Sequence, residues 1–276
     1  MNAKTDDLEL RLLLEALHQA YHYDFRGYSV ASLKRRLLQA RAQLGCESFS
    51  QLQDKVLREP AVLPRLVSFL TVQVSDLFRD PAYFRALREQ VVPHLKTYPS
   101  LKVWVAGCSA GEELYSLVIL FREEGLEERT LFYGTDINPE ALARAEAGVY
   151  DLSRMALFTE NHRLSGGRSS LSDYYTAAYG AAAFDRSLRK RAVFSDHSLV
   201  NDAVFAEVQL VSCRNVLIYF DRELQDRAVG LFKGSLARKG FLGLGAKESL
   251  RFSGHASAFT EFARDVRIYQ KRGEEA

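Results

Sequence analysis

The chain has 276 residues, of which 47% are hydrophobic and 26% charged, and its formal net charge is +2. This length suffices for one large domain, or for a small domain joined to a larger one, and the mixture of charged and apolar residues excludes general disorder. The near-neutral charge gives no general reason to expect nucleic acid as a partner. The apolar runs are too short to predict membrane insertion, and the first ten residues lack a signal-peptide pattern.

Residues 6 to about 90 predict helices. A leucine-rich segment begins at residue 10 with helical spacing, and a second helix is predicted over 29–44, with Leu38 among its inward residues and Gly45 closing it. Ser48 has capping-box spacing at the start of a third helix over 48–57. Asp80 followed by Pro81 predicts an N-cap and the first position of a helix that reaches about residue 96. Pro99 then marks a linker.

From residue 101 onward, strands and helices alternate. The predicted strands lie near 101–106, 130–135, 192–195, 207–212 and 240–246, and the predicted helices near 111–124, 138–147 and 221–238. Residues 266–270 predict a further strand, antiparallel at the end of the sheet. This alternation is typical of an α/β fold with a parallel, doubly wound sheet.

Between residues 148 and 192 the alternation breaks. The segment is rich in Gly, Ser, Ala and Tyr and shows no clean strand pattern. It is too long for a plain connection in a compact domain. The sequence therefore predicts either a flexible loop or a small inserted subdomain, in which three tyrosines would supply apolar surface: Tyr174, Tyr175 and Tyr179.

The segment VWVAGCSAGEELYS (103–116) predicts a buried strand, a glycine-containing turn and a helix that opens near Gly111. Glycine lets the backbone approach a ligand closely, and amides at a helix start are ready donors. The next predicted strand, LFYGTD, ends at Asp136, an acid placed to accept hydrogen bonds from two ribose hydroxyls. Together these features indicate an adenosine-containing ligand, although an ordinary strand–turn–helix unit with a surface acid is the alternative.

Two acids at the helix start narrow the choice of ligand. The turn lacks the glycine pattern of dinucleotide sites, and no P-loop lysine follows. Glu112 and Glu113 would repel a phosphate but suit a cationic amino group or a sulfonium. The sequence therefore favours S-adenosylmethionine, with Glu112 itself expected to face solvent at the helix start.

The three cysteines are odd in number and have no C-x-x-C spacing, which predicts a reducing, cytoplasmic location without disulfides or a zinc site. Cys108 and Cys213 are interpreted as small buried residues near a site rather than as nucleophiles. The histidines show no metal-ligand spacing, so no metal is expected. Four of them are interpreted as surface or turn residues: His94, His162, His197 and His255.

Five motifs occur in a fixed order: TVQVSDLFRD (71–80), AGCSAGEELYS (106–116), GTDINPEAL (134–142), CRNVLIYFD (213–221) and LGAKESL (244–250). Together they resemble the CheR-type chemoreceptor glutamate O-methyltransferases over nearly the whole chain. The resemblance implies an N-terminal all-helical domain for substrate docking (1–90) and a Rossmann-like class I methyltransferase domain (91–276). It also implies a small β-subdomain inserted at 150–191, which in some members docks a receptor-tail peptide by strand addition.

The resemblance also assigns residues to the site. Arg79 and Tyr219 would lie near the reacting centre. The contacts of S-adenosylmethionine and its product S-adenosylhomocysteine would come from Gln73, Ser75, Arg79, Gly107, Glu113, Asp136, Ser198, Leu199, Asn215 and Val216. A basic helix carrying Lys34, Arg35 and Arg36 would dock the acidic receptor helices.

Each assignment has a plainer alternative. The basic helix could be a solvated charged face, and Arg79 could form a surface salt bridge with Asp76 or Asp80. Tyr219 could be a core tyrosine, and Asn215 could cap the turn after its strand. The chain also departs from the family pattern at four positions: Gln73 and Ser198 replace Asn, Leu77 replaces Phe, and Leu114 replaces Pro.

The resemblance implies transfer of a methyl group from S-adenosylmethionine to glutamate carboxylates on the cytoplasmic helices of a methyl-accepting chemoreceptor, forming methyl esters for sensory adaptation. It also implies a monomer that neither binds nucleic acid nor inserts into a membrane. Gln73 and Ser198 motivate an alternative, a non-catalytic regulatory module that binds S-adenosylmethionine or S-adenosylhomocysteine. A methyltransferase for nucleic acid or small molecules is a third hypothesis, disfavoured by the charge and by the lack of an NPP-type motif.

Overall fold

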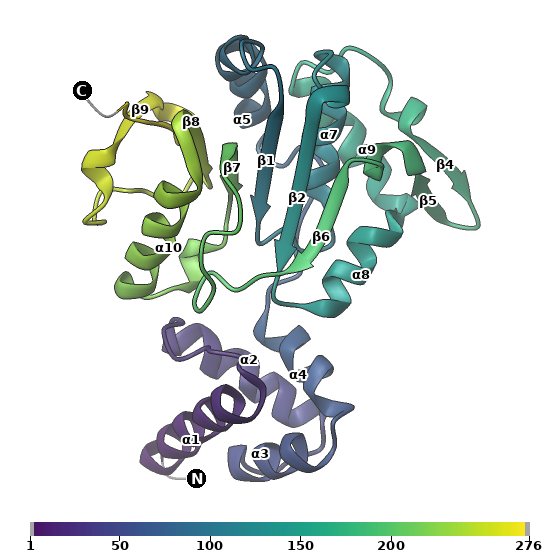
Figure 1. The fold of residues 1–276 in the computed structure, drawn as a ribbon. Coiled ribbons are helices and arrows are strands. Elements are labelled where there is room, and N and C mark those ends of the chain that lie inside the picture. Colours follow the sequence, from purple (N-terminus) through teal and green to yellow (C-terminus); the bar gives the residue numbers. More distant parts are fainter. Residues whose placement is uncertain (1–2, 274–276) are drawn as a thin grey trace.

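The computed structural model describes residues 3–273 of the chain. Four helices lie together at one end of the molecule, and strands β1 and β2 of a larger sheet point toward them (Figure 1). Helices cover both faces of that sheet. The carboxyl edge of the parallel strands therefore faces the N-terminal helices. In open α/β sheets, ligands bind at this edge.

The N-terminal helices have a core of their own, in which Phe25, Leu37 and Phe49 are fully buried. Gly45, at φ +70°, closes the second helix, and the Ser48 hydroxyl accepts the backbone N–H of Gln51 at 3.1 Å, as predicted. Leu38 was expected to face inward but is exposed. The bounds of these helices are α1 (Ala3–Tyr21), α2 (Val30–Gln43), α3 (Phe49–Arg58) and α4 (Val62–Leu70).

The predicted helix over 81–96 is a helical segment that a π-helical turn interrupts. Its parts are α5 (Pro81–Ala86), η1 (Leu87–Val91) and α6 (Val92–Leu95), and its buried residues share a core with the large sheet. Asp80 occupies the N-cap position, but the prediction that it caps the helix is wrong. Its backbone is left-handed (φ +58°) and its carboxylate binds Arg214 instead of the helix amides.

Within the described residues, the large sheet has seven strands in the order β6-β2-β1-β7-β8-β10-β9. The first five are parallel, and β10 and β9 follow as antiparallel strands. The α/β fold class is therefore confirmed, and the strand predicted near 266–270 is antiparallel, as expected. Its predicted place at the end of the sheet was wrong, because β9 lies beyond it. The bounds of the strands, with the connecting helices, are β1 (Leu101–Ala106), α7 (Glu112–Glu123), β2 (Thr130–Asp136), α8 (Pro139–Ala147), β6 (Ala192–Asp196), β7 (Val208–Cys213), α10 (Arg222–Ser235), β8 (Leu236–Leu244), β9 (Phe259–Ala263) and β10 (Ile268–Lys271).

Two boundaries near the C-terminus differ from the prediction. Helix α10 ends at Ser235, and β8 begins at once at Leu236. Within β8, Lys239 has a left-handed backbone (φ +60°), and the exposed pair Arg238 and Lys239 interrupts the pattern of buried residues. Strand β9 was not predicted. It lies at the edge of the sheet and buries only Phe259 fully, so it lacks the apolar pattern on which strand prediction depends.

The segment after α8 forms a small subdomain rather than a flexible loop. It consists of β3 (Val149–Asp151), α9 (Met155–Leu164), β4 (Tyr175–Ala178) and β5 (Ala181–Phe184), and its antiparallel sheet has the order β3-β5-β4. These strands have at most four residues and several alanines, which explains why no strand pattern was visible. Tyr174 is buried as expected, whereas Tyr179 is fully exposed at the β4–β5 turn.

Two of the four histidines interpreted as surface or turn residues are buried, so that prediction was wrong for them. His162 bonds the Glu123 carboxylate at 3.0 Å, and His197 packs against Trp104. Cys108 and Cys213 are buried as predicted, and burial raises the pKa of both thiols well above the ordinary value. Among the helices of residues 3–273, none is both long and apolar enough to cross a membrane.

Candidate functional site

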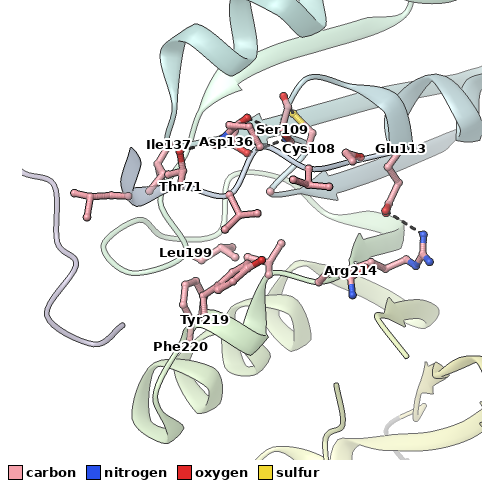
Figure 2. Close-up of a pocket in the computed structure, with 18 of the residues that line it drawn as sticks. Thr71, Cys108, Ser109, Glu113, Asp136, Ile137, Leu199, Arg214, Tyr219 and Phe220 are labelled. Atoms are coloured by element: carbon pink, nitrogen blue, oxygen red, sulfur yellow. Dashed lines mark hydrogen bonds and ion pairs between the residues drawn. The ribbon is translucent and has the colours of Figure 1, made fainter. Parts of the chain in front are cut away.

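A pocket of about 920 Å³, including its open mouth, lies between the carboxyl edge of the sheet and the N-terminal helices (Figure 2). It brings together residues that are far apart in the sequence. Most of the predicted site residues line it: Arg36, Gln73, Ser75, Arg79, Gly107, Glu113, Asp136, Leu199, Asn215, Val216 and Tyr219. Three predicted residues do not line it: Lys34, Arg35 and Ser198.

Asp136 ends strand β2, and backbone amides hold its carboxylate. One oxygen accepts the N–H of Ser109 at 2.8 Å, and the other accepts the N–H of Asn138 at 2.9 Å. Burial raises the pKa of this carboxyl, and these two N–H groups oppose that effect because they stabilise the ionised form. The carboxylate is therefore fixed at the strand end, with acceptor capacity left for the two hydroxyls of a ribose.

The turn between β1 and α7 requires glycine at Gly107. Its φ is +71°, and a Cβ atom there would lie 2.5 Å from a methyl group of Val216. The backbone N–H groups of Gly107 and Cys108 both bond the carbonyl of Thr135, which joins the turn to β2. The absence of a side chain at Gly107 thus lets the turn pack against the loop after β7, and both segments line the same pocket.

The two acids at the start of α7 have different environments. Glu113 lines the pocket, where it accepts a hydrogen bond from the Ser212 hydroxyl at 2.6 Å and lies 3.2 Å from Nη1 of Arg214. Glu112 was expected to face solvent, and that expectation was wrong. It is buried and pairs with Arg154 at 3.0 Å, and burial raises the pKa of its carboxyl. Only Glu113 is thus available to a cationic ligand.

Arg214 is a pocket residue that was not predicted. Its side chain is almost fully buried, and its Nη2 atom bonds the carbonyl of Arg79 at 2.8 Å and the carboxylate of Asp80 at 2.7 Å. The guanidinium also lies over the ring of Tyr83, 4.2 Å from its centroid. It thereby joins the loop before α5 to Glu113. Figure 2 shows the pair that Arg214 forms with Glu113. Its position inside the CRN motif was the signal that could have revealed it.

Arg79 lies in the loop between α4 and α5, which forms one wall of the pocket. Its Nη1 atom donates to the carbonyl of Val74 at 3.2 Å. The suggested salt bridges with Asp76 or Asp80 do not account for it, because Asp76 pairs with Arg154 and Asp80 with Arg214. The guanidinium retains donors for another acceptor.

Another part of the pocket wall comes from the loop after β7 and from the N-terminal helices. The guanidinium of Arg36 lies 4.6 Å from the ring centroid of Tyr219 and donates to the carbonyl of Leu70 at 2.5 Å. Tyr28 pairs with Phe220 in an isolated antiparallel bridge, which holds the start of α2 next to the loop after β7. Arg36 is therefore buried in the pocket wall and is not part of the outer basic face of its helix.

The other two basic residues of that helix have different surroundings. Lys34 forms an ion pair with Asp7 at 2.5 Å, whereas Arg35 is exposed. Both lie outside the pocket lining. Of the three basic residues predicted to dock a partner, only Arg35 is exposed.

Gln73 and Ser198, the two residues that replace asparagine of the family pattern, differ in their positions. Gln73 lines the pocket, but its carbonyl oxygen accepts the Ser109 hydroxyl at 2.8 Å and its amide donates to Thr71 at 3.0 Å. The Ser198 hydroxyl accepts the backbone N–H of Val200 at 3.2 Å, so it closes a local turn instead of reaching the pocket. Its neighbour Leu199 does line the pocket.

Several further lining residues were not predicted. Some belong to motifs already identified, so their place beside known site residues was an available signal. Others come from the N-terminal helices and loops, where nothing local marks them. Besides Arg214, they are Tyr28, Leu70, Thr71, Val72, Val74, Cys108, Ser109, Ile137, His197 and Phe220.

Comparison with known proteins agrees with this geometry. Residues 73–268 match the family description "CheR methyltransferase, SAM binding domain", and residues 8–71 match "CheR methyltransferase, all-alpha domain". The protein is thus an S-adenosylmethionine-dependent methyltransferase, and the predicted cofactor is confirmed. More particularly, the chain belongs to the CheR methyltransferase family.

Three relatives illustrate the similarity. The Cher3 protein of Pseudomonas putida is 54% identical over 268 residues, which span 97% of this chain and 98% of that protein. A chemotaxis protein methyltransferase of Listeria innocua is 31% identical, over 82% of this chain and 84% of its own length. Chemotaxis protein methyltransferase 1 of Pseudomonas aeruginosa is 30% identical, over 91% of this chain and 92% of its own length.

The residues present fit S-adenosylmethionine. The fixed Asp136 carboxylate suits the ribose hydroxyls, and the Gly107 turn, packed against Val216, lines the same pocket. The Glu113 carboxylate in the pocket lining would suit the cationic amino group of the methionine portion. The loop after β7, which carries Asn215 and Val216, closes the pocket from the opposite side.

Proposed function

We propose that this protein methylates glutamate side-chain carboxylates on the cytoplasmic helices of a methyl-accepting chemoreceptor. The observation that carries the proposal is the distribution of charge around the pocket. Carboxylates from Asp136 and Glu113 line it together with guanidinium groups from Arg36, Arg79 and Arg214, of which Arg214 pairs with Glu113. The acids suit the cofactor, and the guanidinium groups suit an incoming carboxylate.

The proposed nucleophile is a carboxylate oxygen, which needs no general base because glutamate, with a pKa near about 4.3, is already ionised at neutral pH. When bound, S-adenosylmethionine supplies a methyl group on positively charged sulfur. The chain's own contribution is to orient the carboxylate and to exclude water from it. Arg79 would hold the carboxylate, and Tyr219, fixed beneath Arg36, would form the adjoining wall.

We further propose that residues 1–90 dock the receptor helices and that residues 91–276 carry out the transfer. Exposed Arg35, with Lys34 beside it, would attract the acidic receptor surface. A receptor-tail peptide would add to the inserted subdomain (150–191) at β4, an edge strand whose last three residues are exposed. We expect the protein to act as a monomer, which size-exclusion chromatography with light scattering would test.

The test uses methyl-labelled S-adenosylmethionine, the purified protein and membranes that contain chemoreceptors from the same organism. Alkali releases glutamyl methyl esters as volatile methanol but leaves N-methyl groups in place. We expect alkali-labile label on a receptor-sized band, and we expect Asp136→Ala to abolish it. A receptor in which the methylated glutamates are changed to alanine serves as the matched substrate control and should remain unlabelled.

A second candidate function is a non-catalytic module that binds S-adenosylmethionine or S-adenosylhomocysteine. The observation that favours it concerns the two replaced residues. The side-chain amide of Gln73 is hydrogen-bonded to Ser109 and Thr71, and the Ser198 hydroxyl closes a local turn, so neither group is directed to the cofactor. Cofactor binding by calorimetry without alkali-labile label on any receptor would support this module and contradict the enzyme for those receptors.

A further inference from the structure

One buried carboxylate near the pocket has no part in the function proposed above. Glu248 follows strand β8 and is 4% exposed. One of its oxygens accepts the backbone N–H of Asn215 at 3.0 Å and that of Gly245 at 2.6 Å, and the other accepts the N–H of Ile218 at 3.3 Å. Glu248 itself does not line the pocket, whereas Asn215 and its neighbours do.

The contacts of Glu248 fall on a strained part of the backbone. Asn215 has φ +61°, a left-handed conformation that costs a residue other than glycine free energy. Gly245 packs directly against it, since a Cβ atom at Gly245 would lie 2.8 Å from the backbone nitrogen of Asn215. Gly245 and Glu248 therefore form a cradle that holds the loop after β7 in one conformation.

The carboxylate of Glu248 is costly to bury, and it satisfies backbone donors from two segments at once. Burial raises the pKa of the Glu248 carboxyl, because the ionised form is costly away from water. The hydrogen bonds that the structure gives this carboxylate come from backbone N–H groups of two segments, 215–218 and Gly245. An apolar side chain would avoid the buried charge but would leave these donors unpaired, so the carboxylate serves to orient them.

We propose that Glu248 is a positioning residue of the cofactor site. By holding the N–H groups of Asn215 and Ile218, it fixes Asn215 and Val216 against Gly107 and sets the start of the segment that carries Tyr219. This inference rests on the proposed placement of the cofactor in this pocket. It predicts that Glu248 affects cofactor affinity through Asn215, without touching the cofactor.

The experiment measures the Kd of S-adenosylhomocysteine by calorimetry, and thermal unfolding of the same samples. Glu248→Gln keeps the size but turns one acceptor into a donor that faces an N–H group, and we expect a Kd about tenfold or more higher. Glu248→Asp keeps the charge but shortens the side chain by one methylene, which moves the carboxylate away from the N–H groups, and we expect a smaller increase in Kd. This variant replaces Glu248→Gln if the latter does not fold. Glu223→Gln, exposed on α10, is the matched control and should not change the Kd.

A double-mutant cycle with Asn215→Ala separates positioning from general destabilisation. If Glu248 acts through the Asn215 side chain, Glu248→Gln will raise the Kd by a smaller factor in the Asn215→Ala background than in the wild type. A full additive loss in that background, or an unchanged Kd with a lower Tm, would overturn the proposal. If Asp136→Asn also leaves the Kd unchanged, the cofactor does not bind in this pocket as proposed. That outcome rejects the placement of the cofactor, and the positioning role of Glu248 is rejected together with it.

Discussion

Asp136→Asn should weaken cofactor binding while leaving the fold nearly intact. The substitution keeps the size of the side chain but leaves one acceptor oxygen in place of two. In the wild type both oxygens accept backbone N–H groups, from Ser109 at 2.8 Å and Asn138 at 2.9 Å. The amide must therefore turn its donor toward one of these N–H groups, or toward the ribose.

The expected magnitude follows from the lost charged acceptor. A hydrogen bond to a charged group contributes about 1.5–3 kcal/mol, so the Kd for S-adenosylhomocysteine should rise about 10- to 150-fold. The free energy of unfolding should change by less than about 2 kcal/mol, because two effects oppose each other. One backbone N–H loses its partner, but the variant also removes a buried charge. Since burial raises the folded-state pKa of Asp136, ionising it costs stability as the pH rises through that pKa.

Isothermal titration calorimetry with S-adenosylhomocysteine measures the Kd, and urea unfolding without ligand measures stability. Asp265→Asn is the matched control, because Asp265 is exposed and does not line the pocket. A Kd within twofold of wild type for Asp136→Asn would refute the reasoning. So would an equal loss of affinity in Asp265→Asn.

Three further predictions test other parts of the structure. Gly107→Ala places a Cβ 2.5 Å from Val216 at a φ of +71° and should lower the free energy of unfolding by about 2–5 kcal/mol; a loss below about 1 kcal/mol in urea unfolding would contradict it. Arg79→Lys loses the planar fork and should lower kcat/KM for receptor methylation about tenfold or more while the Kd of S-adenosylhomocysteine stays within about threefold; an unchanged kcat/KM would exclude Arg79 from orienting the carboxylate. Burial by itself would raise the pKa of Glu123, but hydrogen bonds from His162 and Ser169 lower it from 4.5 to about 2. The ionised Glu123 carboxylate therefore stabilises the folded state by about 3 kcal/mol. This stabilisation is complete above pH 4.5 and is lost as the pH falls toward 2. Glu123→Gln should flatten that part of the stability curve, and parallel curves for variant and wild type would count against the assignment.

The order of strands and helices and the cofactor edge of the sheet could be predicted from the sequence because both depend on local patterns. A buried strand, a glycine turn and a helix start are contiguous in the chain, so Gly107 and Glu113 were identifiable without a structure. The same holds for Asp136, which ends the next apolar strand. The inserted strands and β9 escaped prediction because they are short or lie at a sheet edge, where little alternation is required.

The partner of each polar side chain, by contrast, was decided by tertiary structure. Glu112 is buried because Arg154, which lies just before helix α9 of the inserted subdomain, reaches it, whereas the identical residue beside it faces the pocket. Arg36 enters the pocket wall because the start of α2 pairs with the loop after β7. Local sequence determines which segments become helices and strands, but a buried charge takes the nearest compensating group in space, and that group is often far away in the chain.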